Sequence, residues 1–153
     1  MDKLDDWLIA IHILSAVIWV GGSFVTQAHA IRAQHGGAVS VGSFGQDSEF
    51  IGFRVFLPAA LTVLITGIWL ISRDVFTLDQ WNVWGLIVAG SSLATGAGYL
   101  GPESGKIAGL IDDRGPDDPE AMRRLSRLFV VSRVELTLLV SVVLVMAIKP
   151  FAG

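Results

Sequence analysis

Two side chains in apolar stretches of this sequence could bind a metal, His12 and Met146. Neutral imidazole is a ligand of haem iron and of copper, and a methionine thioether is a soft ligand of both. His12 lies inside a stretch, Trp7 to Ile31, without Asp, Glu, Lys or Arg. The ring is expected roughly 7–8 Å below the end of a helix that rises about 1.5 Å per residue. Met146, close before Pro150, lies at a matching depth in the last apolar stretch.

The other two histidines are poorly placed to complete a site with His12. His29 lies about 25 Å further along the same helix, and His35 falls in the loop that follows. The possibilities left open are a five-coordinate haem on His12 alone, a His12 and Met146 pair for haem or copper, or a site completed by a second subunit. A histidine that only hydrogen-bonds a neighbouring helix is a further alternative.

The last apolar stretch also carries two charged residues, Arg133 and Glu135. At this spacing they point about 200° apart on a helix and are not expected to pair with each other. Arg133 lies near the predicted membrane boundary, so its guanidinium can extend to the lipid headgroups. Glu135 lies deeper and needs a partner, for which Arg54 at the start of the second stretch is predicted. Such a pair is either functional or a structural ion pair.

Four apolar stretches position these residues, and each is long enough to cross a hydrocarbon core of about 30 Å as a helix. The 153-residue chain is 52% hydrophobic and 16% charged, whereas soluble domains carry about 25% charged residues. The sequence therefore predicts an all-α, polytopic membrane protein, a single domain with an up-down bundle of four transmembrane helices in a lipid bilayer. The predicted spans are residues 7–31, 54–73, 81–101 and 128–149.

The segments between the spans differ in composition. Residues 33–50 are rich in Gly and Ser and are predicted to form a flexible loop, and residues 74–80 a tight turn. Residues 102–120 are predicted to form the main polar loop. The end of this loop favours a helix start, with Asp118 as the N-cap and Pro119 as the first helical residue.

The third span contains Gly90, Ala94 and Gly98 at intervals of four residues, with Ser92 and Gly96 on a neighbouring row. Rows of small residues let helix backbones approach closely in membranes. We expect this row to pack inside the bundle, and a homodimer face is the alternative.

Basic residues predict the orientation. Three lie on the side of the termini and seven on the side of the two longer loops, which favours cytoplasmic loops and external termini in a bacterial inner membrane. Four of the five tryptophans should then lie near the outer interface. These are Trp7, Trp69, Trp81 and Trp84.

Composition also excludes several classes of function. The chain has no cysteine, which excludes disulfides and thiolate metal sites. Its formal net charge of −3 offers no basic surface for nucleic acid. The sequence contains no phosphate-binding glycine loop and no HExxH motif.

The segment IHILSAVIWVGGSF, with His12, Trp19, Gly21 and Gly22, resembles the first helix of the CopD-like bacterial integral membrane proteins, and most of all an uncharacterised branch of small predicted membrane proteins. The apolar helix that follows Arg133 and ends in Lys149-Pro150 also resembles that branch. A more distant likeness is to the HemJ-type protoporphyrinogen oxidases. The first resemblance implies copper handling. The second implies haem and porphyrin chemistry, with His12 as a haem ligand.

These observations lead to three hypotheses. The first is a four-helix protein that binds a b-type haem near its outer face through His12, with Met146 at matching depth, in a redox or electron-transfer role. The second is a non-catalytic accessory subunit of a larger membrane complex of the respiratory type. The third is copper handling or transport. Whether the protein is an enzyme stays open at this stage.

Overall fold

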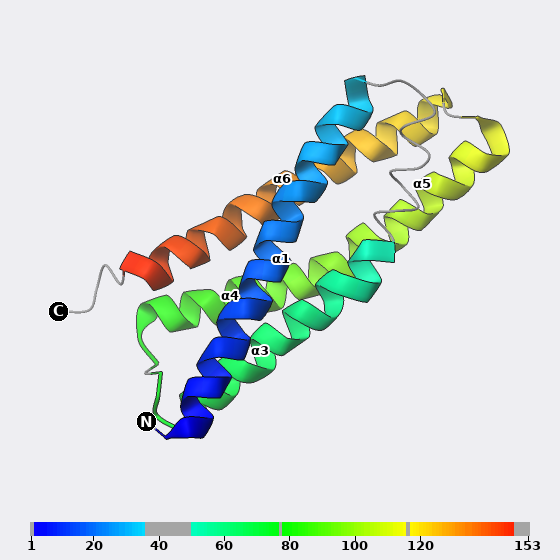
Figure 1. Ribbon diagram of the computed structural model, residues 1–153. Coiled ribbons are helices and arrows are strands. Elements are labelled where there is room, and N and C mark those ends of the chain that lie inside the picture. Colours follow the sequence, from blue (N-terminus) through cyan, green and yellow to red (C-terminus); the bar gives the residue numbers. More distant parts are fainter. Residues whose placement is uncertain (1, 36–49, 77, 116, 149–153) are drawn as a thin grey trace.

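The computed structural model describes residues 2–35, 50–76, 78–115 and 117–148 (Figure 1). All regular secondary structure within these ranges is helical. The chain contributes α1 (Lys3–His35), a five-residue π-helical segment η1 (Gly52–Phe56), α3 (Leu57–Ser72), α4 (Gln80–Thr95), a second π-helical segment η2 (Gly96–Leu100), α5 (Gly101–Arg114) and α6 (Pro119–Ile148).

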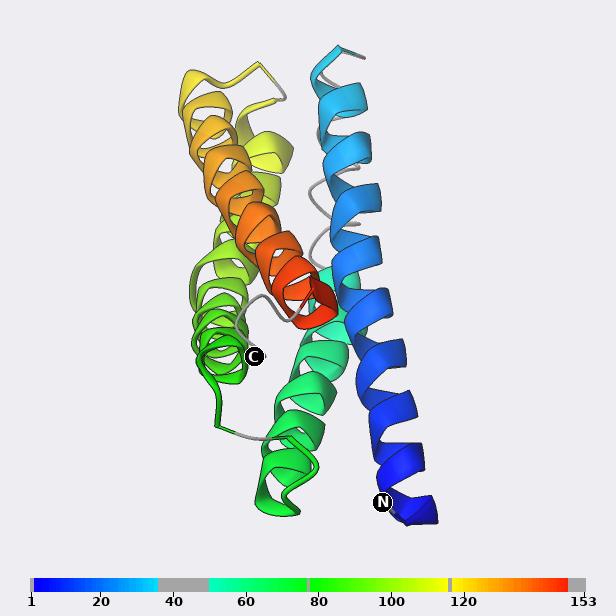
Figure 2. The same ribbon diagram turned by 90° about the vertical axis from the view of Figure 1, so that its left-hand side faces the viewer.

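These elements form four continuous helices, each long and apolar enough to cross a membrane. The protein is thus a multi-pass membrane protein with an all-α four-helix bundle, as the sequence predicts. α1 packs against α3 and α6, and α4 packs against α3 and α6 in turn. Figure 2 shows the bundle from the side, with α1 running along one edge. The large apolar side chains that face outward on every helix suit a lipid environment.

The third helix is longer than predicted, and most of the predicted polar loop at 102–120 is wrong. α4, η2 and α5 run on without a break to Arg114. The reason is an amphipathic pattern in α5: Ile107, Ala108 and Ile111 are buried against α6, while polar residues of α5 such as Asp112 face outward. Because this segment has a low mean hydropathy, hydropathy alone did not predict that the helix of the third span continues through it.

The connection between α5 and α6 contains the turn signals that end one helix and begin the next. Gly115 has a φ of 92° and donates its N–H to Ile111 O at 2.9 Å, which closes the end of α5. Asp118 Oδ1 accepts the N–H groups of Glu120 and Ala121, both at 3.0 Å. The predicted N-cap at Asp118 and helix start at Pro119 are therefore confirmed.

Two ion-pair networks lie at opposite ends of the bundle. At the end where α1 begins, called the N-terminal end here, Arg73 Nε contacts Asp5 Oδ1 at 2.5 Å and an Arg73 terminal nitrogen contacts Asp2 Oδ2 at 2.7 Å. At the other end, called the α5 end, the Arg124 guanidinium bridges Glu103 on α5 and Glu120 on α6. Each network fastens helices to each other outside the apolar core.

The row of Gly90, Ala94 and Gly98 is not packed inside the bundle, contrary to expectation. A methyl group added at Gly90 or Gly98 would meet no atom within 4 Å, and Ala94 is exposed. The neighbouring row faces inward instead, since Ser92 is buried. Periodicity identified the two rows, but the rotation of α4 about its axis decides which of them is internal.

Candidate functional site

His12 is buried in the N-terminal half of the bundle, with 8% of its surface exposed. α1 presents the ring to α3, where its Nδ1 lies 2.9 Å from the Thr66 hydroxyl oxygen. The Thr66 hydroxyl carries one hydrogen and lies 2.6 Å from the Thr62 carbonyl oxygen, to which it donates. The Nδ1–H group of His12 therefore donates to Thr66, which assigns the proton to Nδ1 and leaves Nε2 as a free lone pair.

This arrangement of His12 is the one that a metal-binding histidine requires. Ligating histidines donate the other ring N–H to an oxygen atom, which fixes the tautomer and the ring orientation. The ring is further held by an edge contact with Phe76, at 6.1 Å between centroids and 75° between planes. Gly67 leaves room for it, because a Cβ at that position would lie 3.3 Å from His12 Cε1.

The structure brings Met146 to the same cavity as His12. Both side chains line a space of about 70 Å³ between the helices. Apart from His12 and Asn82 its lining is apolar. Met146 reaches the cavity across Gly85 of α4, where an added Cβ would lie only 2.6 Å from the Met146 methyl group. The two candidate ligands, one from α1 and one from α6, thus share one small apolar cavity.

The predicted partner of Glu135 is not in contact with it. The Arg54 guanidinium is exposed and lies over the Phe50 ring, 5.3 Å from its centroid, and no ion pair links Glu135 to Arg54 or Arg133 among the described residues. Arg133 is exposed on α6. Arg54 therefore contacts the Phe50 ring and not Glu135.

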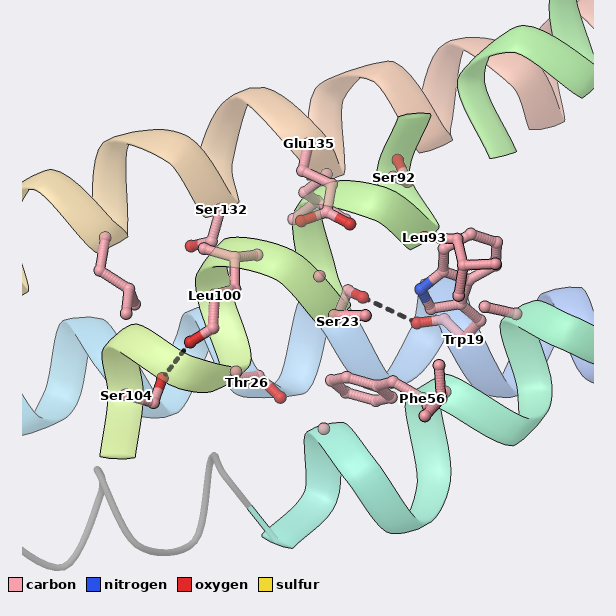
Figure 3. A pocket seen from close by; sticks show the side chains of 18 of the residues that line it. Trp19, Ser23, Thr26, Phe56, Ser92, Leu93, Leu100, Ser104, Ser132 and Glu135 are labelled. Carbon is pink, nitrogen blue, oxygen red and sulfur yellow. Dashed lines mark hydrogen bonds between the residues drawn. The ribbon is translucent and has the colours of Figure 1, made fainter. Parts of the chain in front are cut away.

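Glu135 faces a second, larger cavity of about 130 Å³ (Figure 3). All four long helices contribute to its wall, and both π-helical segments do so as well. Ser92 of α4 lies next to the Glu135 carboxyl group. Gln27 of α1 and Ser132 of α6 share a hydrogen bond at the same wall. The sequence analysis did not single out Gln27 or Ser132, although an uncharged polar residue in a long apolar helix is a usable signal.

The described residues form a multi-pass four-helix membrane protein in which one cavity is lined by both His12 and Met146 and another by the carboxyl group of Glu135. Comparison with family models, with curated proteins and with solved structures finds no match.

The donor set at His12 fits a soft or borderline metal ion. Among the described residues no group of three or more His, Asp or Glu side chains could hold a metal, so a site here depends on the thioether of Met146. Imidazole and thioether also form an axial pair for haem iron. A porphyrin, however, needs a pocket of several hundred Å³, and the space at His12 is about 70 Å³. As packed, the cavity accommodates an ion and not a macrocycle.

Proposed function

We propose that this protein binds a single copper ion, as Cu(I), between His12 Nε2 and the Met146 thioether, and that its role is copper handling within the membrane. The observation that carries the proposal is the small apolar cavity lined by both side chains. Thioether and imidazole are ligands that Cu(I) accepts, and thioethers favour it over harder ions such as Mg²⁺ or Ca²⁺.

The surroundings of the pair support this assignment. The Thr66 contact keeps the His12 lone pair on Nε2, so no proton has to leave the ring when the metal binds. Gly67 and Gly85 provide space beside the two ligands. Apart from Asn82, the remaining wall is apolar and offers no carboxylate ligand. A bound ion would hold α1 and α6 together at this depth.

The test is a Cu(I) titration of the detergent-purified protein against a colorimetric Cu(I) chelator. Wild type is expected to withdraw one equivalent of copper. His12→Ala and Met146→Leu are expected to lose that competition. Two matched controls exist in the chain: His29→Ala removes an exposed histidine of the same helix, and Met122→Leu removes a methionine from the same α6 helix. Equal copper retention in wild type and His12→Ala would overturn the proposal.

Haem is the second candidate, favoured by the same His12 and Met146 pair as axial ligands. It requires α4 or α6 to move outward, because the cavity at His12 is about 70 Å³. An absorbance spectrum of protein produced with ample haem separates the two candidates. A Soret band that disappears in His12→Ala assigns haem, whereas copper binding without such a band assigns Cu(I).

A further inference from the structure

The Glu135 cavity has no role in the proposed copper site and lies in the other half of the bundle. Trp19 is the one side chain that lines both cavities. The cavity lies between two apolar clusters, one around Trp19 and Leu139 and one around Phe129 and Ile107. A carboxyl group in a mostly apolar cavity inside the bundle requires an explanation of its own.

The polar atoms that face this cavity are almost all hydrogen-bond acceptors. Ser23, Thr26 and Ser104 each donate their hydroxyl hydrogen to the carbonyl group four residues earlier in their own helix, at 2.8, 3.0 and 2.8 Å. What they can offer to the cavity is therefore oxygen lone pairs. Figure 3 shows the Ser23 and Ser104 bonds as dashed lines at the cavity wall.

Gln27 adds a further acceptor. Its amide nitrogen donates to Ser132 Oγ, while its Oε1 is buried without a hydrogen-bond partner among the described residues. A buried acceptor without a partner destabilises the folded state. Oε1 exposes almost no surface to the cavity in this packing, so a donor group of a ligand would pair with it after rotation of the Gln27 side chain.

Charge points in the same direction. Glu135 is the only ionisable side chain that lines this cavity among the described residues, and no basic side chain faces it. Four aromatic rings share the wall, namely Trp19, Phe53, Phe56 and Phe129. Aromatic faces attract cations, and a carboxylate in an apolar cavity is stabilised by one. The cavity therefore complements a positive charge that also carries hydrogen-bond donors.

We propose that the Glu135 cavity binds a small lipophilic ammonium ion, with the N–H groups directed to Glu135 and Gln27 and the apolar body among the aromatic rings. The volume of the cavity limits the size of the apolar body of this ligand. An apolar protein cavity of about 150 Å³ admits benzene, and this one measures about 130 Å³. A primary amine attached to a single ring or a short alkyl chain fits this description.

The two π-helical segments belong to the same cavity. Gly52, Phe53 and Phe56 of η1 and Gly96 and Leu100 of η2 all line it. A π-helical turn widens a helix by inserting a residue and occurs frequently at functional sites. Two such segments on separate helices, both facing one cavity, are a second and independent indication that this space is used.

The experiment is a titration of the full-length protein in detergent with benzylamine, which is protonated at neutral pH, and with benzyl alcohol, its neutral counterpart of similar size. Binding is followed by isothermal titration calorimetry. Wild type is expected to bind benzylamine saturably. Glu135→Gln is expected to bind it about 10- to 100-fold more weakly while its weaker binding of benzyl alcohol is unchanged, which shows that the cavity is intact.

Asp112→Asn is the matched control, because it removes an exposed acid of α5 outside the cavity. Gln27→Leu is the second variant, expected to weaken benzylamine binding if Glu135→Gln does not fold. Equal affinity of wild type and Glu135→Gln for benzylamine would overturn the proposal, as would the absence of saturable binding to wild type. Copper titrations are independent of these outcomes, so the two proposals fail separately.

Discussion

Thr66 determines which ring nitrogen of His12 carries the proton. Its hydroxyl accepts the Nδ1–H of His12 while it donates to a backbone carbonyl. Thr66→Val keeps the shape and removes the acceptor. Outer partners of metal-ligating histidines contribute about 10- to 100-fold to metal affinity. We therefore expect Thr66→Val to lower Cu(I) affinity by that factor in the chelator competition.

Thr62→Val is the control for this change, because the Thr62 hydroxyl donates to the Pro58 carbonyl one turn earlier in its own helix, at 2.8 Å, and has no hydrogen bond to His12 among the described residues. It should leave copper affinity unchanged. Identical affinities for Thr66→Val and wild type would mean that the orientation of His12 does not depend on Thr66.

Gly85 tests the position of Met146 without altering either ligand. The added methyl of Gly85→Ala would lie 2.6 Å from the Met146 methyl group, so the Met146 side chain has to move. The Met146 methyl group is the end of a flexible side chain and can give way at small cost, which the higher helix propensity of alanine offsets. We expect weaker Cu(I) binding, by less than in Met146→Leu, with little change in the unfolding temperature.

Gly90→Ala offers a comparison on the same helix. Its methyl group meets nothing within 4 Å, and alanine favours helix over glycine by about 1 kcal/mol. This variant should bind copper as wild type does and unfold no more easily. A loss of copper affinity in Gly90→Ala equal to that in Gly85→Ala would contradict a local effect on Met146.

For single residues, the sequence predicted how deep a side chain lies along its helix. It did not predict the direction in which the side chain points around the helix. Counting residues from the helix ends placed His12 and Met146 at one level, and the structure places them at one cavity. The same counting suggested Arg54 as the partner of Glu135, yet Arg54 points toward Phe50. Depth along a helix follows from residue number, but the azimuth of one helix relative to another follows from packing.

The ion-pair network at the N-terminal end shows how single contacts hold α1 against the end of α3. Asp5 is buried at the start of α1, and its carboxylate accepts a hydrogen bond from Arg73, beyond the end of α3. This bond raises the pKa of Arg73 above its ordinary value. Arg73→Gln would leave the buried Asp5 carboxylate without its cation. We expect a lower midpoint of thermal unfolding in detergent, measured by circular dichroism.

Lys106→Gln is the control for Arg73→Gln. Lys106 is an exposed residue whose ammonium lies 3.6 Å from Glu103, and exposed pairs contribute little to stability. A drop in the unfolding midpoint after Lys106→Gln as large as that after Arg73→Gln would show that burial of Asp5 is not the cause.

The third helix shows why element boundaries were less predictable than the elements. Hydropathy located its apolar part, and polar residues after Gly101 favoured a loop. The buried face of α5 is made by three small or branched apolar residues among polar ones, a pattern that becomes stable only through contact with neighbouring helices, chiefly α6. The π-helical segments have no sequence pattern comparable to the apolar pattern of a span, since they depend on the packing contacts with neighbouring helices.

Considered as a whole, the molecule is built in layers along its long axis. From the N-terminal end they are the Arg73 network, the His12 cavity, the cluster around Trp19, the Glu135 cavity, the cluster around Phe129 and the Arg124 network. Trp19 belongs to both cavities and to the cluster between them. The Trp19 side chain therefore lies between the two cavities.

The orientation of this layered molecule in the membrane is predicted by its basic residues, of which the sequence assigns three to the side of the termini and seven to the side of the two longer loops. Because the chain has no cysteine, one introduced cysteine gives a unique label. In intact bacterial cells a membrane-impermeant maleimide should modify Asp6→Cys and should reach Asp112→Cys only after permeabilisation. Both positions are exposed acids at opposite ends. This result would place the His12 cavity in the outer half of the membrane and the Glu135 cavity in the inner half. The reverse labelling would exchange the two sides, so that copper would reach His12 from the cytoplasm.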